Sequence, residues 1–186
     1  MLHSIRRRSL PLILAFAVMA VAPARQGLAA DAAGLNEDAA AALAALYKQQ
    51  PAAQMLGEHA KAILIFPNIV KAGFMVGGQY GEGVLQKGGK TVGYYNSMAA
   101  SYGLQAGVQA FGYALFLMTD SAVKYLDNSK GWELGVGPSI VVLDAGTAKN
   151  LTTTTLKQDV YGFIFDQKGL MAGLGIQGTK ITKVSK

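Results

Sequence analysis

One stretch, residues 61–85, most constrains what this chain can fold into, because it places five glycines among large apolar residues. It reads KAILIFPNIVKAGFMVGGQYGEGVL. Each glycine in a helix interior costs about 1 kcal/mol relative to alanine, whereas strands accept glycine where the backbone bends or closely approaches another backbone. We therefore expect strands over 62–66 and 73–80, with the second bending into a third over 82–87.

The chain downstream repeats this pattern of apolar runs separated by glycine-rich turns. The sequence Lys87-Gly88-Gly89-Lys90 predicts a tight hairpin that joins strand 82–87 to a strand over 91–96. Residues 101–118 alternate with period two, which predicts a long strand with one buried face. That face would carry Leu104, Ala106, Val108, Ala110, Ala114 and Phe116, with Gln105 and Gln109 on the other. Further strands are expected over 132–136, 139–144, 160–165, 170–177 and 180–184.

The segment before this strand-rich part is expected to form two short helices. Asn36 is the expected N-cap of a first helix over 36–49, and Pro51 suits the first turn of a second helix. Two amphipathic helices packed on a sheet are the simpler interpretation. The alternative is a membrane-surface helix, which needs a basic polar face. Here the polar face is mixed, with Glu37, Asp38 and Lys48.

A third, short helix is expected over 121–127, capped by Thr119 or Asp120. Several short strands with glycine-rich turns, combined with few helices, indicate an α+β fold. We predict a β-rich single domain over residues 30–186. Its core would be a curved antiparallel sheet or a small barrel-like core, with N-terminal helices and one short helix near 120–127.

Residues 1–29 have the three parts of a secretory signal peptide. Arg6, Arg7 and Arg8 are followed by an apolar run over 10–21, which is shorter than the roughly 20 residues that cross a bilayer. Small residues at Gly27 and Ala29 place the expected cleavage after Ala29, with Ala30 as the alternative site. A retained anchor helix is the competing interpretation. The sequence thus predicts an exported, periplasmic protein that is free or peripheral at a membrane.

The charge of the exported part excludes several classes of function. The four arginines all lie within residues 1–29, so residues 30–186 keep 13 lysines against 11 acidic residues, a net charge of +2. Without the bidentate arginine fork that phosphate and base recognition prefers, nucleic-acid binding is not expected. The chain has no cysteine, which excludes disulfides, Cys-ligated metals and acylation as a lipoprotein.

No group of residues has the pattern of a catalytic or metal site. His59 is the one histidine outside residues 1–29, and no second ligand stands at metal-ligand spacing from it apart from the neighbouring Glu58. Residues 173–178 match GxGxxG, but the helix and the acidic residue that a dinucleotide site requires do not follow. We therefore expect no enzyme activity, no cofactor and no metal.

Four lysines punctuate the glycine-rich part of the chain, at expected strand ends and turns: Lys61, Lys71, Lys87 and Lys90. Solvated strand ends are one interpretation. The functional interpretation is a loose cationic patch for anionic lipid headgroups, in which each lysine contributes about 1 kcal/mol near a charged surface.

Seven stretches resemble the SYLF lipid-binding domain family in order and spacing. They are AKAILIFP (60–67), KAGFMVGGQYGEGVL (71–85), GYYN (93–96), SYGLQAG (101–107), FLMTD (116–120), GWELGVG (131–137) and YGFIFDQKGLMAGL (161–174). The resemblance covers most of the chain from about Met55 to Val184. It implies a single β-rich domain with helices, no known enzyme activity, and binding to phospholipid membranes.

Eukaryotic relatives recognise phosphoinositides, and some fungal members bind actin. This chain differs in its acidic, alanine-rich first helix and in its signal peptide, so actin is not an expected partner. We expect a non-enzymatic domain that binds phospholipid peripherally in the bacterial envelope, favouring anionic headgroups. The alternative is an envelope structural or interaction protein that binds a protein partner, whose identity the sequence does not indicate, or a small apolar ligand.

Overall fold

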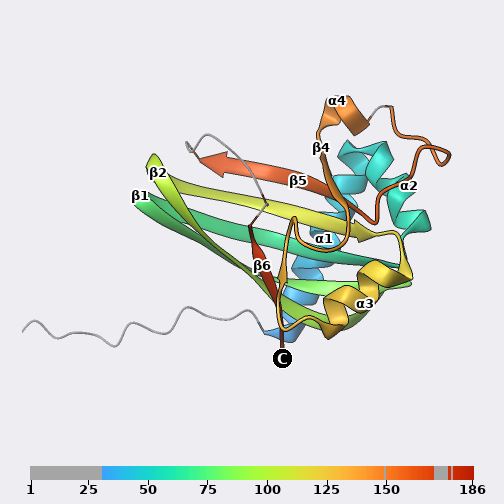
Figure 1. The fold of residues 1–186 in the computed structure, drawn as a ribbon, viewed down its shortest axis with the longest axis horizontal. Helices are drawn as coiled ribbons and strands as arrows, with labels where there is room; N and C mark the ends of the chain where they lie inside the picture. Colours follow the sequence, from blue (N-terminus) through green and yellow to red (C-terminus); the bar gives the residue numbers. More distant parts are fainter. Residues whose placement is uncertain (1–30, 149, 170–175, 177) are drawn as a thin grey trace, which may run out of the picture.

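A computed structural model describes residues 31–148, 150–169, 176 and 178–186, and these residues form an α+β fold, as the sequence predicts (Figure 1). Its elements are, in chain order, α1 (Ala32–Gln49), α2 (Pro51–His59), β1 (Ala62–Lys87), β2 (Lys90–Leu117), α3 (Asp120–Asn128), β3 (Trp132–Glu133), β4 (Ile140–Leu143), α4 (Ala145–Ala148), β5 (Val160–Gly169) and β6 (Lys180–Val184). The predicted strand over 170–177 lies almost wholly outside the described residues.

Strands β1 and β2 form one long antiparallel hairpin. They pair from Ala62 opposite Leu117 to Lys87 opposite Lys90, so the breaks that we predicted within each strand are wrong. Three bulges, after Phe66, Phe74 and Leu85, absorb the irregular positions while the pairing continues. The predicted tight turn is confirmed. Gly88 and Gly89 have φ angles of 55° and 75°, which side chains rarely adopt.

The hairpin curls back on itself, so that the two halves of β1 touch. A Cβ atom at Gly83 would overlap the carbonyl oxygen of Ile65 in the same strand. Figure 1 shows both strands running out to a common end and returning. We call that end the tip (residues 70–80 and 98–108) and the remainder of the hairpin the root (residues 62–69, 81–97 and 109–117). The predicted curvature of the sheet is confirmed.

The length of β2 allows two strands to share its second edge. Strand β6 pairs with residues 94–98 of β2, and β5 pairs with residues 109–117. Strand β3 then pairs with β6, and β4 pairs with β5 in parallel. This parallel pair departs from the antiparallel sheet that we predicted. Strand β3 is also shorter than predicted, because Gly135 and Gly137 turn the chain with φ angles of 101° and 90°.

Helices α1 and α2 cover the outer face of the root. The N-cap of α1 is Asp31, whose Oδ1 accepts a hydrogen bond of 2.6 Å from the Gly34 amide, so our assignment of Asn36 is wrong. Asn36 instead ties α1 to β2. Its amide nitrogen donates to the Tyr94 hydroxyl, and its oxygen accepts from Thr91. Pro51 begins α2 and Thr119 caps α3, both as predicted.

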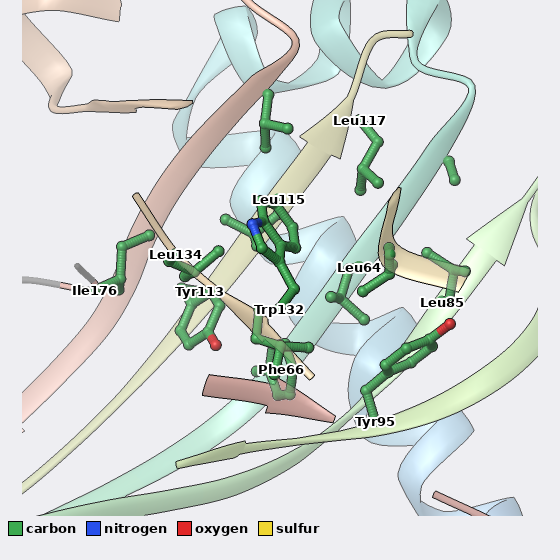
Figure 2. Packing of buried hydrophobic residues seen from close by; sticks show 14 of the residues in the cluster. Leu64, Phe66, Leu85, Tyr95, Tyr113, Leu115, Leu117, Trp132, Leu134 and Ile176 are labelled. Carbon is green, nitrogen blue, oxygen red and sulfur yellow. The ribbon is translucent and has the colours of Figure 1, made fainter. Parts of the chain in front are cut away.

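The core consists of two apolar clusters, one on each face of the root. On the inner face Trp132 lies among Leu115, Leu134 and Tyr113, with Phe66 beside them (Figure 2). The Trp132 indole donates a 3.0 Å hydrogen bond to the Val136 carbonyl, which satisfies its only polar atom. The cluster under the helices holds four leucine and alanine positions of α1 with strand residues, among them Ile65, Phe116 and Phe163. Each fully buried large apolar side chain contributes about 1.5–3 kcal/mol.

Candidate functional site

The tip extends beyond the strands that support the root. Strand β5 pairs with β2 only from Gln109 onward, and β6 pairs with it only as far as Met98. Residues 99–108 therefore pair with β1 alone. The chain bends there at Met75, which has a φ angle of 60° next to the bulge between Phe74 and Val76. The tip is the free end of the curled hairpin in Figure 1.

The outer face of the tip is apolar and exposed. Alternate residues of β1 point to this face, as the pleat of a strand requires. Phe74 is 74% exposed and Val76 is 60% exposed, values typical of polar surface residues. Among the described side chains of the tip, the exposed apolar ones on this face are Val70, Phe74, Val76, Tyr80, Met98 and Val108. Met75, at the bulge between Phe74 and Val76, is 54% exposed as well. Several large apolar side chains exposed on one face are a feature that interaction surfaces share.

The inner face of the tip is polar and buried. Lys71, Gln79 and Gln109 are each less than one tenth exposed. The Gln79 amide donates a 3.0 Å hydrogen bond to Thr179. The Gln109 Oε1 atom has no hydrogen-bond partner among the described residues. The tip thus inverts the usual arrangement, with polar groups inside and apolar groups outside.

This inversion overturns one prediction for β2. We expected Val108 on the buried face and Gln109 on the other, whereas Val108 is 62% exposed and Gln109 is buried. The reason is the extent of the helix layer. Ala114 and Phe116 lie on the same face as Val108 and are fully buried, because they belong to the cluster that α1 and α2 cover. Val108 is not part of that cluster, so its side chain is left exposed.

Two exposed lysines flank the tip where it meets the root. Lys168 of β5 stands opposite Ala110, and Lys180 of β6 stands opposite Met98. Directly paired residues project to the same face of a sheet. The two lysines therefore share the outer face with the apolar residues. Sequence reasoning missed both, because only the strand register brings them to the tip.

Acidic groups also lie near this boundary. Glu133 stands opposite Lys180 on β3, and the exposed Asp166 precedes Lys168 on β5. Glu82 binds the Lys186 ammonium at 2.8 Å and accepts a 3.1 Å hydrogen bond from Tyr80. Burial, together with the Glu82 carboxylate, raises the pKa of Tyr80, so its phenol stays protonated and neutral. The carboxylates therefore stand at the base of the tip, while residues 70–80 and 98–108 themselves contain none.

The structure distributes the four predicted lysines over separate parts of the hairpin. Lys61 is exposed just before β1, and Lys71 is buried on the inner face of the tip, where it has an interaction partner. Lys87 and Lys90 face each other at the turn, and the Lys87 ammonium lies 3.5 Å from the Asp127 carboxylate. Only Lys87 and Lys90 are thus brought together by the register. Their role in lipid binding stays a prediction.

The first helix offers no free apolar face. Leu35, Ala39, Leu43 and Leu46 are buried against the sheet. Insertion of this helix into a membrane, which the sequence left open, would expose the cluster that it covers. None of the helices within the described residues is long and apolar enough to cross a membrane.

An open groove of about 550 Å³ runs between α1 and the strands near the base of the tip. Its lining includes Phe111 and Pro67, but also the charged Asp38, Asp166 and Lys168. This mixture does not match the mostly apolar lining of pockets for small apolar ligands.

Residues that could hold a metal ion do not gather within the described part of the chain. The described residues contain no group of three or more His, Cys, Asp or Glu that could hold a metal ion. The His59 Nδ1 atom lies 2.8 Å from the Met55 carbonyl on the exposed side of α2, which is a local helix contact.

The fold defines a class, a β-rich α+β domain, here with exposed apolar side chains at the tip of its long hairpin. Residues 98–186 match the model of the family Ysc84, described as Las17-binding protein actin regulator. This match confirms the SYLF resemblance for the part that runs from the second half of β2 to the end of the chain. SYLF domains are binding domains associated with lipid and with actin regulators, and the family is not a known enzyme family. No curated protein matches the chain.

Proposed function

We propose that this protein is a non-enzymatic phospholipid-binding domain that docks peripherally on a membrane of the bacterial envelope. The observation that carries the proposal is the inverted tip, where apolar side chains face solvent and polar ones face inward. The lipid association of the SYLF family supports the same function.

A membrane would remove the exposed apolar area of the tip from water. Burying apolar surface yields about 25 cal/mol per Å², so a few large side chains suffice for reversible binding. The tip can supply these side chains without unfolding, because they are already exposed. A charged protein surface would instead lose hydration at the same boundary.

Support for an envelope location comes from residues 1–29, whose basic start, apolar run and small residues have the form of a signal peptide. Mass spectrometry of the protein purified from the periplasm tests this part of the proposal. A new N-terminus at Ala30 or Asp31 is expected. An intact Met1 in a protein recovered from the cytoplasm would contradict it.

Vesicle co-sedimentation tests the binding itself. The exported protein is mixed with neutral and with anionic phospholipid vesicles at low and high salt. We expect binding to both, stronger to anionic vesicles at low salt, because a charged headgroup adds to an apolar attraction. Absence of binding to either composition would overturn the proposed function.

The lysines proposed from sequence have their own test in the same assay. A variant with Lys61, Lys71, Lys87 and Lys90 changed to Gln is expected to lose part of the anionic preference, by about fivefold for each lysine that meets the surface. Unchanged binding to anionic vesicles would remove these residues from the lipid site.

A protein partner is the second candidate, because the matching family is described as a Las17-binding actin regulator. Exposed apolar side chains also mark protein interfaces. Fractionation of cells separates the two functions. A lipid-binding protein enters the membrane fraction and leaves it in carbonate, whereas a soluble interaction protein stays outside it.

A further inference from the structure

We propose that the tip is the membrane anchor and that it lies with its outer face in the interfacial layer of a phospholipid bilayer. In this seating Phe74, Met75 and Val76 enter below the headgroups, and Lys168 and Lys180 lie at the level of the phosphates. The proposal rests on the proposed function and assigns the residues and the orientation of binding.

The distribution of apolar and charged residues selects lipid as the occupant. Residues 70–80 and 98–108 contain no carboxylate and one lysine, Lys71, which is on the inner face. The exposed surface of the tip is therefore free of charged side chains among the described residues. The charged groups near its base are Glu82, Glu133, Asp166, Lys168 and Lys180. A free apolar end with charges only at its base suits a bilayer, whose apolar interior is bounded by polar headgroups.

The register fixes the orientation. Across the sheet, Val70, Ala110 and Lys168 form one row at the base of the tip, and Tyr80, Met98 and Lys180 form the other. Both rows run from an apolar residue to a lysine on the same outer face, and the second row continues to Glu133 of β3, opposite Lys180. A lysine thus borders the apolar surface on each arm of the curled hairpin. Tyr80 suits the interface as well, since its ring is half exposed and its hydroxyl is hydrogen-bonded.

The polar inner face explains why the tip remains outside the core. Gln79, Gln109 and Lys71 separate the apolar cluster, which ends at Ile69 and Phe111, from the end of the hairpin. Any collapse of the outer face into the protein would have to bury these groups deeper or turn them to the surface. The exposed apolar side chains therefore need a partner to cover them. The positive charges of Lys168 and Lys180 are complementary to an anionic lipid surface.

A site-specific probe tests this seating directly. The chain contains no cysteine, so Phe74→Cys can be labelled alone with an environment-sensitive fluorophore, and Asn128→Cys on α3 serves as the matched control. Figure 1 places α3 away from the tip. With the exported protein and vesicles, we expect a blue shift and quenching by lipid-borne nitroxides at position 74 only. Sedimentation without any change at position 74 would overturn the seating but leave the proposed function standing.

A pair of variants measures how much the apolar residues contribute. Phe74→Gln with Val76→Gln is expected to lower the vesicle partition coefficient about tenfold or more. The matched control, Val136→Gln with Val142→Gln, removes exposed valines elsewhere and should change it less than twofold. Equal partition of both double variants would contradict the proposal. Failure of the parent protein to bind would instead count against the function itself.

The lysine rows are tested against exposed lysines outside the tip. Lys168→Gln with Lys180→Gln should weaken binding to anionic vesicles at low salt about fivefold per lysine, with little change on neutral vesicles. Lys124→Gln with Lys130→Gln, two exposed lysines in and after α3, is the control and should retain the parent affinity. A larger loss of anionic-vesicle binding in the control than in Lys168→Gln with Lys180→Gln would overturn the proposed orientation. Emission from Trp132, the single and buried tryptophan, verifies that each variant is folded.

Discussion

The root and the tip of the hairpin are built from the same two strands, yet their side chains have opposite environments. Phe66 in the root is fully buried, whereas Phe74 in the tip is 74% exposed. The Phe66 ring packs 4.7 Å from that of Tyr113, between centroids, and both belong to the cluster that contains Trp132. Phe74 belongs to neither core cluster.

Burial of a side chain in this sheet therefore depends on whether another layer covers the sheet at that position. In the root the outer face is covered by α1 and α2, and the inner face by β3, α3 and the returning half of the hairpin. Beyond those layers the same alternation of residues continues, but the apolar face meets solvent. A strand pattern alone is thus compatible with either environment.

The largest effect should come from removing a core residue of the root. Trp132→Ala is expected to lower the free energy of unfolding by about 3–5 kcal/mol, because the cavity cannot fully close. Phe74→Ala in the tip should change it by less than about 0.5 kcal/mol, because its side chain is exposed. Urea denaturation followed by circular dichroism measures both. Similar losses for the two variants would mean that the tip is part of the core.

Substitution of two glycines of β1 should change the free energy of unfolding by smaller and different amounts. Gly83→Ala places a methyl group against the Ile65 carbonyl, and the overlap should cost about 1–3 kcal/mol. Gly78→Ala meets only the Ala99 carbonyl at 3.6 Å, an ordinary contact, and should be neutral or stabilise by up to about 1 kcal/mol. The same urea titration compares them. A tolerated Gly83→Ala would contradict the close contact between the two halves of β1.

The smallest effect concerns pH and Asp159, whose side chain links the start of β5 to Ser139 before β4 and to Thr119 before α3. Hydrogen bonds from the Ser139 amide and hydroxyl, and a further one from Thr119, lower the pKa of Asp159. Because the folded-state pKa is depressed, this stabilisation is present above the ordinary aspartate pKa of about 3.9 and is lost as pH falls through the folded value.

Thermal unfolding between pH 7 and pH 2 measures this contribution. Asp159→Asn should flatten the acid side of the stability profile. Asp166→Asn, at the exposed end of β5, is the control and should leave the profile unchanged. A stability profile that does not differ between Asp159→Asn and the parent would show that the ionised Asp159 carboxylate does not stabilise the folded protein.

Local patterns predicted much of the fold. The α+β class, the curved sheet, the Lys87–Lys90 turn, the Pro51 helix start and the Thr119 cap are all confirmed. Each depends on a few neighbouring residues and on backbone preferences that act locally. The parallel pairing of β4 with β5 was missed, because it joins strands that are distant in sequence and has no local signal.

The sequence indicated the kind of site, a lipid-binding surface, but not the residues of the tip that we propose for it. The resemblance indicated a lipid-binding domain, and sequence reasoning chose lysines at expected turns. The exposure of the tip could not be predicted, because Phe74, Met75 and Val76 are residue types that are typical of a buried strand. The absence of carboxylates does not mark the tip either, because it extends over residues 59–81 and 83–119 and so includes most of the root.

Local sequence patterns were enough to predict most strands and the Lys87–Lys90 turn, because alternation, glycine pairs and caps act through neighbouring residues. Composition showed that the chain has no cysteine and that residues 30–186 have no arginine, which argues against several chemistries. Which apolar face is covered, and which lysines border it, depended on tertiary contacts. Coverage depends on how far α1, α2, β5 and β6 extend along the hairpin, and that extent is set by contacts between residues far apart in the chain.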